Sequence, residues 1–389
     1  MKLAVVTTVY RLDSHTDVLL ARWFEDVPSD RQWGWAGPRS RIAAAYVAQL
    51  PDNDLSAGRF ATHAVPTFPT IAETLRVGGT SLGVDGVLLI AEHGDYPFND
   101  FGQHLYPRDE MFHAIADVFE ADGRAVPVFV DKHLSWDFDR ARGMLDRAEA
   151  LGFEVLSASS IPFCRHDPPL GWEGEPIDEA VAVFPLVDGG KAESYGYHSL
   201  EFLQHTLERR PGGAAGVERV MAWRGDAVWE AAQAGAWSGE LFEKVCEHAM
   251  PDCTVASSAS ERGASQPTQA FRLDYTDGLR VTHVGMAGWD RFAFSMRRGE
   301  RMRATVARAG TGRDERYANF AILARVLEDW LAGGPRPYPD RRMLMTCGSL
   351  QAAAHALALP PGSPVPTPHL AGLAYTPSPH RSGIDHFPA

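Results

Sequence analysis

The sequence predicts an α/β domain followed by an α+β domain. Before residue 165, buried β-rich runs alternate with helical patterns, which is typical of right-handed βαβ units and a parallel sheet. After that residue the strand-like runs come singly, and Thr276-Asp277-Gly278 separates two of them as a hairpin turn would. We therefore expect a parallel sheet in residues 1–165, a mostly antiparallel open sheet in residues 166–345, and an extended tail in residues 346–389.

The first domain is expected to hold strands and helices in alternation. Ser14 is a good N-cap for the first helix, and Gly123 and Gly152 suit the ends of two later ones. The expected strands are Leu3–Tyr10, Arg41–Gln49, Val84–Ile90, Val126–Val130 and Phe153–Leu156. The expected helices are His15–Glu25, Ile71–Leu75, Glu110–Ala121 and Asp137–Leu151.

The second domain shows a helical pattern over Tyr195–Arg210 and four separate strand-like runs. The Ser-, Ala- and Gly-rich segment Asp252–Gln266 is expected to be a surface loop, and Pro360–Ala389 has the composition of an extended tail. The expected strands are Ala180–Phe184, Val217–Arg224, Gln269–Tyr275 and Arg280–Met286.

Composition restricts the class of partner. The net charge of −13 argues against nucleic acid, because phosphate binding needs a concentrated basic surface. No apolar run approaches the roughly 20 residues of a membrane helix. The four cysteines are scattered without a C-x-x-C pair, which argues against a disulfide scaffold and suits a reducing compartment. We expect a cytoplasmic protein with a small-molecule partner, bound to neither nucleic acid nor membrane.

Two clusters of ionisable residues follow two buried strands. Glu92, His93 and Asp95 come after the first strand, and Asp131-Lys132-His133 comes after the second. In an open parallel sheet, ligands bind outside the carboxyl ends of the strands. The two clusters therefore predict one site. A third group of residues, His198 and Glu201, opens a helical pattern further along the chain.

These segments resemble the glucose–fructose oxidoreductase / inositol dehydrogenase family. The matching stretches read VDGVLLIAEHG, GRAVPVFVDKH and ESYGYHSLEFL. In the resemblance, Lys132 matches the functional lysine of the family and His198 its catalytic histidine, while Glu201 stands where aspartate is usual. The resemblance implies a Rossmann-like first domain, an α+β second domain, and a homodimer formed through the open sheet.

The first turn departs from this family. A dinucleotide binder needs G-x-G-x-x-G after its first strand, so that the backbone can approach the diphosphate. Here the turn from Thr7 to His15 reads TTVYRLDSH and contains no glycine. We infer that classical NAD(P) binding is lost. The site has gained imidazoles and carboxylates instead, and that combination predicts a metal.

The proposed metal ligands are His93, His198 and Glu201. His198 and Glu201 have i, i+3 spacing and share one helical face. His205 lies another turn along, and three ligands from one helix would stretch over ~10 Å, so His205 is an alternate that suits the outer shell. Two histidines and one carboxylate are typical of mononuclear non-haem Fe(II) oxygenases. The alternates for the ligand from a strand end are Asp131, His133 and Asp95.

The leading functional hypothesis is an Fe(II)- and O2-dependent oxygenase that acts on a small ring substrate. Lys132, His133 and Asp95 would handle protons beside the iron. The sequence also resembles non-haem iron enzymes that form an oxazine ring in nucleoside-antibiotic biosynthesis, which implies oxidative rearrangement of a pyridine C-nucleoside. Two alternatives stay open. One is an NAD(P)-dependent oxidoreductase with a degenerate phosphate loop, and the other is a non-catalytic binding protein.

Overall fold

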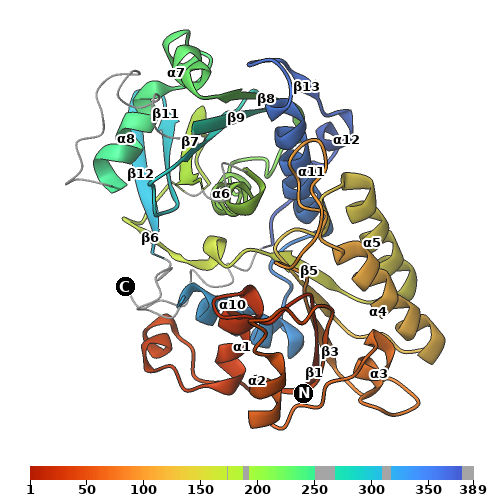
Figure 1. The fold of residues 1–389 in the computed structure, drawn as a ribbon. Helices are drawn as coiled ribbons and strands as arrows, with labels where there is room; N and C mark the ends of the chain where they lie inside the picture. The colour runs from red at the N-terminus through yellow and green to blue at the C-terminus, as the bar shows by residue number, and fades with distance from the viewer. Residues whose placement is uncertain (173, 187–191, 250–267, 309–316, 379–389) are drawn as a thin grey trace.

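The chain forms two β-sheets that are joined and covered by helices (Figure 1). A computed structural model describes residues 1–172, 174–186, 192–249, 268–308 and 317–378. The expected loop at Asp252–Gln266 lies outside these described residues. The predicted fold class is confirmed, because a parallel sheet comes first and a mostly antiparallel sheet follows it.

The first sheet has five parallel strands in the order β2-β1-β3-β4-β5. Its central strands are buried apart from Lys2 and are rich in Val and Leu, as expected for a sheet covered on both faces. Because all five strands are parallel, their carboxyl ends meet at one edge. The strands are β1 (Lys2–Thr7), β2 (Arg41–Val47), β3 (Gly86–Ile90), β4 (Val128–Asp131) and β5 (Val155–Ala158).

Helices connect these strands, and their ends follow the sequence signals. The Ser14 side chain caps α1, the Asp137 side chain caps α5, and Gly123 and Gly152 end α4 and α5 in the left-handed region. The helices are α1 (His15–Phe24), η1 (Pro28–Trp33), α2 (Ser56–Thr62), α3 (Ile71–Arg76), α4 (Arg108–Asp122), α5 (Phe138–Leu151) and η2 (Ile161–Phe163).

The second sheet has eight strands in the order β13-β8-β9-β10-β7-β11-β12-β6. All pairs are antiparallel except β7 with β10. The predicted hairpin joins β9 and β10. The strands are β6 (Arg165–Asp167), β7 (Glu179–Pro185), β8 (Val217–Arg224), β9 (Thr268–Tyr275), β10 (Arg280–Met286), β11 (Ala293–Arg298), β12 (Arg301–Arg308) and β13 (Val365–Pro366).

Both faces of the second sheet are covered in the described chain. Helix α6 (Ala192–Leu207) lies on the face toward the first domain (Figure 1). On the other face, α7 (Asp226–Gln233) and α8 (Gly239–Ala249) form a separate core with the sheet, which includes Trp229, Trp237 and Phe242. The chain's own helices therefore cover the two faces of the predicted sheet. A homodimer formed through this sheet stays a prediction. The described residues leave neither face of the sheet uncovered to support it.

The C-terminal part departs from the predicted domain limits. Helix α10 (Asn319–Leu331) returns to the first domain, where Leu331 approaches Gly86 in β3. The expected extended tail from residue 346 is wrong for its first part, because α11 (Asp340–Leu357) runs through it. Its alanine-, leucine- and methionine-rich sequence favours a helix, and α11 packs against α6 and β8. After it come β13 and α12 (Pro368–Ala371).

Candidate active site

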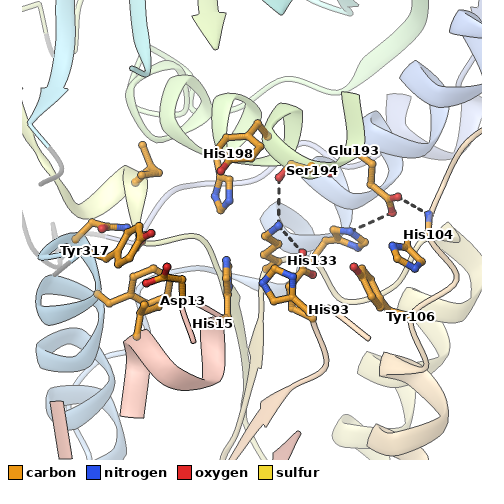
Figure 2. Close-up of a pocket in the computed structure, with 18 of the residues that line it drawn as sticks. Asp13, His15, His93, His104, Tyr106, His133, Glu193, Ser194, His198 and Tyr317 are labelled. Carbon is orange, nitrogen blue, oxygen red and sulfur yellow. Dashed lines mark hydrogen bonds and ion pairs between the residues drawn. The ribbon is translucent and has the colours of Figure 1, made fainter. Parts of the chain in front are cut away.

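A cavity of about 570 Å³ lies between the carboxyl edge of the first sheet and α6 (Figure 2). A volume of this size suits a small-molecule ligand. Histidines, two arginines, a lysine and acidic side chains line it, and a group of aromatic rings faces them. The residues used below are Glu92, His93, Arg108, Lys132, His133, His15, Glu193, Ser194, His198, Tyr195, Phe292 and Phe320.

Lys132 belongs to a buried ion-pair cluster at the cavity wall. Its Nζ lies 2.6 Å from Glu92 Oε1 and donates to the Ser194 carbonyl at 3.2 Å. Arg108 pairs with the other Glu92 oxygen. Burial by itself would raise the pKa of Glu92, but the charges of Lys132 and Arg108 hold that pKa well below its usual value. Glu92 is therefore a carboxylate, and two cations face it beside the cavity.

His198 enters the cavity from α6. Its Nδ1 shares a hydrogen bond of 2.6 Å with the hydroxyl of Ser159, which fixes the ring. Burial, followed by the charge of Lys132, lowers the pKa of His198 well below its ordinary value. The imidazole is therefore neutral at physiological pH. When Nδ1–H donates to Ser159, Nε2 presents a lone pair to the cavity, and this lone pair can accept a proton.

His15 reaches the same space from the first residue of α1. Its Nδ1 lies 2.6 Å from Oδ2 of Asp131, a buried carboxylate at the end of β4. The His15 ring lies 5.5 Å from that of His93 and 6.4 Å from that of His198, between centroids. His15 is not among the site residues predicted from the sequence. The available signal was a histidine directly after the first strand's turn, where the family has its glycines.

His93 and His133 stand beside these groups. Burial lowers the pKa of His93 to about 3, so this ring is neutral. His133 lies 3.3 Å from an Arg108 nitrogen and 3.5 Å from Glu193, and burial lowers its pKa too. Glu193 also accepts the backbone N–H of His104 at 2.5 Å. His133 is thus held by several partners at one end of the cavity.

The backbone is strained where two strands enter the cavity. His93 has a φ of +69° and Lys132 a φ of +63°, although neither is glycine. The Lys132 carbonyl accepts hydrogen bonds from Tyr197, at 2.9 Å, and from Ser157, which hold this conformation. Non-glycine residues in this region cost about 1–3 kcal/mol each and cluster at functional sites.

Three of the residues predicted from the sequence lie elsewhere. Glu201 is fully buried on another side of α6, where Oε1 pairs with Arg342 at 2.6 Å. His205 lies one turn further, with its ring 6.2 Å from that of Tyr338. Asp95 is exposed, and its backbone N–H and carbonyl bond the side chain of Gln49. The i, i+3 spacing puts Glu201 close to the helix face of His198. Its carboxylate nevertheless lies toward Arg342 of α11, because the two form an ion pair.

The turn between β1 and α1 does not fit a dinucleotide diphosphate. Backbone N–H groups that would face the phosphates are used within the turn. Ser14 N donates to the Arg11 carbonyl at 3.0 Å, and Asp13 N donates to the Asp17 carboxylate at 3.1 Å. The N–H groups of Arg11 and Asp17 both bond the Ser14 hydroxyl. An acidic side chain thus stands at the helix N-terminus, where a phosphate needs free donors.

The adenosine end of such a cofactor meets a second obstacle. Tyr10 is buried after β1, and its ring packs edge-on against Phe60 of α2 with 5.4 Å between centroids. Its carbonyl accepts the N–H of Leu55 at 2.7 Å. The segment after β2 therefore packs directly onto the turn. We conclude that these residues do not fit a dinucleotide bound in the way that a glycine-rich turn binds it.

Comparisons with known proteins support the fold. No protein-family model matches the chain, and no curated protein sequence matches it. The solved structure of GenD2 from gentamicin A biosynthesis, in complex with NAD, is similar with 13% identity and a TM-score of 0.57 over 94% of this chain and 96% of that one. A putative myo-inositol dehydrogenase from Sinorhizobium meliloti 1021 has 11% identity and a TM-score of 0.54, over 92% and 97% of the two chains.

A third similar structure is biliverdin reductase from Synechocystis sp. PCC 6803, in complex with biliverdin and NADP+. It has 12% identity and a TM-score of 0.52, over 92% of this chain and 99% of that one. These likenesses confirm the fold, a parallel Rossmann-like sheet followed by a mostly antiparallel sheet. At such low identity they establish the fold and leave the activity open.

The iron hypothesis is wrong. Among the residues that the structure describes, no group of three or more His, Cys, Asp or Glu side chains is arranged to hold a metal ion. The expected ligand Glu201 forms an ion pair with Arg342 instead. The similar structures include a putative myo-inositol dehydrogenase, GenD2 in complex with NAD, and biliverdin reductase in complex with NADP+. The Fe(II)- and O2-dependent oxygenase and the likeness to oxazine-forming iron enzymes are therefore not supported.

Among the helices of the described ranges, none has the length and apolar character needed to span a membrane.

Proposed function

We propose that this protein is an enzyme that transfers a proton at a carbon next to the carbonyl group of a small polar substrate. The observation that carries the proposal is the placement of neutral His198 and cationic Lys132 on one cavity. A neutral buried imidazole is a competent general base, and an ammonium group beside it stabilises an oxyanion. Both groups are held by fixed partners, Ser159 for His198 and Glu92 for Lys132.

The proposed step needs no external oxidant or reductant. The substrate carbonyl oxygen lies against Lys132, and His198 Nε2 removes the proton from the adjacent carbon. The electron pair of the C–H bond moves into the enolate, whose negative oxygen Lys132 stabilises. Return of a proton to carbon completes an isomerisation or an epimerisation, and loss of a neighbouring hydroxyl completes a dehydration.

The experiment is solvent-deuterium exchange. The purified protein is incubated in D2O with a panel of hydroxy ketones, hydroxy aldehydes and 2-oxo acids, and proton NMR follows the C–H signal next to each carbonyl. We expect the wild-type protein to exchange that proton in at least one compound. Lys132→Met should slow the exchange by about 10²- to 10⁴-fold, the usual contribution of a group that acts in the transition state. Absence of enzyme-dependent exchange across the panel would contradict the proposal.

An NAD(P)-dependent oxidoreductase is the second candidate. It is supported by the sequence resemblance that matches Lys132 and His198 to functional residues of the family, and by a fold shared with proteins solved in complex with NAD and NADP+. The β1–α1 turn argues against this candidate, because its N–H groups are already hydrogen-bonded and do not fit a dinucleotide diphosphate. Saturable binding of a nicotinamide dinucleotide would favour this candidate over proton transfer alone.

A further inference from the structure

His15 and Asp131 form a dyad that the reaction proposed above does not use. Asp131 is buried at the end of β4, and its carboxylate faces Nδ1 of His15 at 2.6 Å. A carboxylate takes the Nδ1–H of such a pair and leaves Nε2 for the ligand side. The ring of Phe320 packs edge-on against His15, with 5.1 Å between centroids, and fixes its direction.

The dyad faces His198 from the opposite wall. His198 points down from α6, and His15 points up from α1, with the cavity between them (Figure 2). The two ring centroids lie 6.4 Å apart, and the ring planes differ by 30°. A ligand that enters this space would therefore meet an imidazole from each wall.

Dinucleotide binding does not account for this arrangement. His15 directly follows the turn whose N–H groups are consumed by Ser14 and Asp17, so the start of α1 presents an imidazole to the cavity in place of phosphate-binding donors. His15 also has two supporting contacts, Asp131 and Phe320, which a solvent-facing histidine would not need.

We propose that the His15–Asp131 dyad is a second catalytic acid–base group, so that the enzyme inverts the configuration of the reacting carbon. This proposal rests on the proposed function. His198 removes the proton from one face and the electron pair enters the enolate beside Lys132. Protonated His15, balanced by Asp131, then delivers a proton from Nε2 to the opposite face, and a new C–H bond forms. The substrate class is a chiral hydroxy aldehyde, hydroxy ketone or related carbonyl compound.

The dyad can be tested before any substrate is known. Diethyl pyrocarbonate acylates the unprotonated nitrogen of histidine, and peptide mass spectrometry gives the rate at each ring. The reaction is run at about pH 8, so that the rate reports the nucleophilicity of the unprotonated ring, and we expect Asp131→Asn, which keeps the side-chain shape and loses the charge, to slow modification of His15. The rate at His113 on α4 should not change and serves as the internal reference. An unchanged rate at His15 would show that Asp131 does not activate it and would overturn the dyad.

The stereochemical claim is tested with a compound that exchanges in the deuterium screen. His15→Asn should lower inversion by about 10²- to 10⁴-fold while keeping deuterium exchange, because His198 can still remove a proton and return one to the same face. Inversion at the wild-type rate, or loss of exchange together with inversion in a folded His15→Asn protein, would overturn the two-base assignment. Exchange by the wild type without any inversion would overturn it too. A wild type that exchanges nothing contradicts the proposed function instead, whatever the acylation result.

Discussion

Two sides of α6 carry buried titratable groups, and they differ in what those groups face. On one side, His198 faces a cavity together with Lys132 and His15. On the other side, Glu201, together with Glu208 just after the end of the helix, bonds Arg342 of α11, with distances of 2.6 and 2.8 Å. Burial and charge are similar on both sides. Only the His198 side is open to a ligand, so only that side can act on a substrate. The Arg342 network on the other side holds α6 and α11 together.

The largest expected effect separates His198 from Glu201, three residues apart. His198→Asn keeps a hydrogen-bonding partner for Ser159 but removes the base. We expect deuterium exchange to fall by about 10²- to 10⁴-fold with an unfolding midpoint close to that of the wild type. Glu201→Gln should keep most of the exchange activity of the protein that remains folded. If His198→Asn and Glu201→Gln lost equal deuterium-exchange activity per folded molecule, the two sides of α6 would not differ in function.

Arg342→Leu tests the structural side. Burial raises the pKa of Glu201 and of Glu208, while the Arg342 charge acts to lower both, so removing it strands two buried carboxyls. Breaking a buried pair costs about 3–5 kcal/mol, which urea unfolding would measure. Arg341→Leu, at the exposed neighbouring position, is the matched control and should change the free energy of unfolding little. A small effect of Arg342→Leu would contradict the structural role.

His283 of β10, which contacts α6, gives a prediction about how the free energy of unfolding depends on pH. His283 bonds Ser199 at 2.8 Å, and burial lowers its pKa to about 3, below the unfolded value of about 6.5. The unfolded chain therefore binds the extra proton, and the free energy of unfolding falls as pH decreases from about 6.5 toward 3.

This histidine should contribute a slope of about 1.4 kcal/mol per pH unit in that interval. His283→Asn removes the titrating group and should flatten the measured dependence by that amount between pH 4 and pH 6. Above a pH of about 7 the stability curves of the two proteins should run parallel. Identical slopes at acidic pH would mean that His283 is not held neutral in the folded state.

Much of the fold could be predicted from sequence, because alternation and capping are local signals. Ser14, Asp137, Gly123 and Gly152 mark helix ends as expected. The prediction failed where long-range packing decides, as in α11, which runs through the expected extended tail and packs against β8 and α6.

The candidate site was likewise predicted only in part. Lys132 and His198 lie at the cavity as the family-like motifs implied, but helical spacing could not reveal that Arg342, far along the chain, would bond Glu201. His15 was missed because the role of the residue depends on Asp131, which lies 116 residues away in sequence. A pattern shows which residues share a helix face, and it does not show the partner that the tertiary fold brings to them.

Whether the cavity takes a nicotinamide dinucleotide is decided by a fluorescence titration of the wild-type protein with NADH and NADPH, with NAD+ and NADP+ as competitors. We predict no saturable binding up to millimolar concentration, because the β1–α1 turn uses its own N–H groups and holds the Asp17 carboxylate at the helix N-terminus. Saturable binding in the micromolar range, displaced by the oxidised nucleotide, would contradict it. The cavity would then be the site of a nicotinamide oxidoreductase.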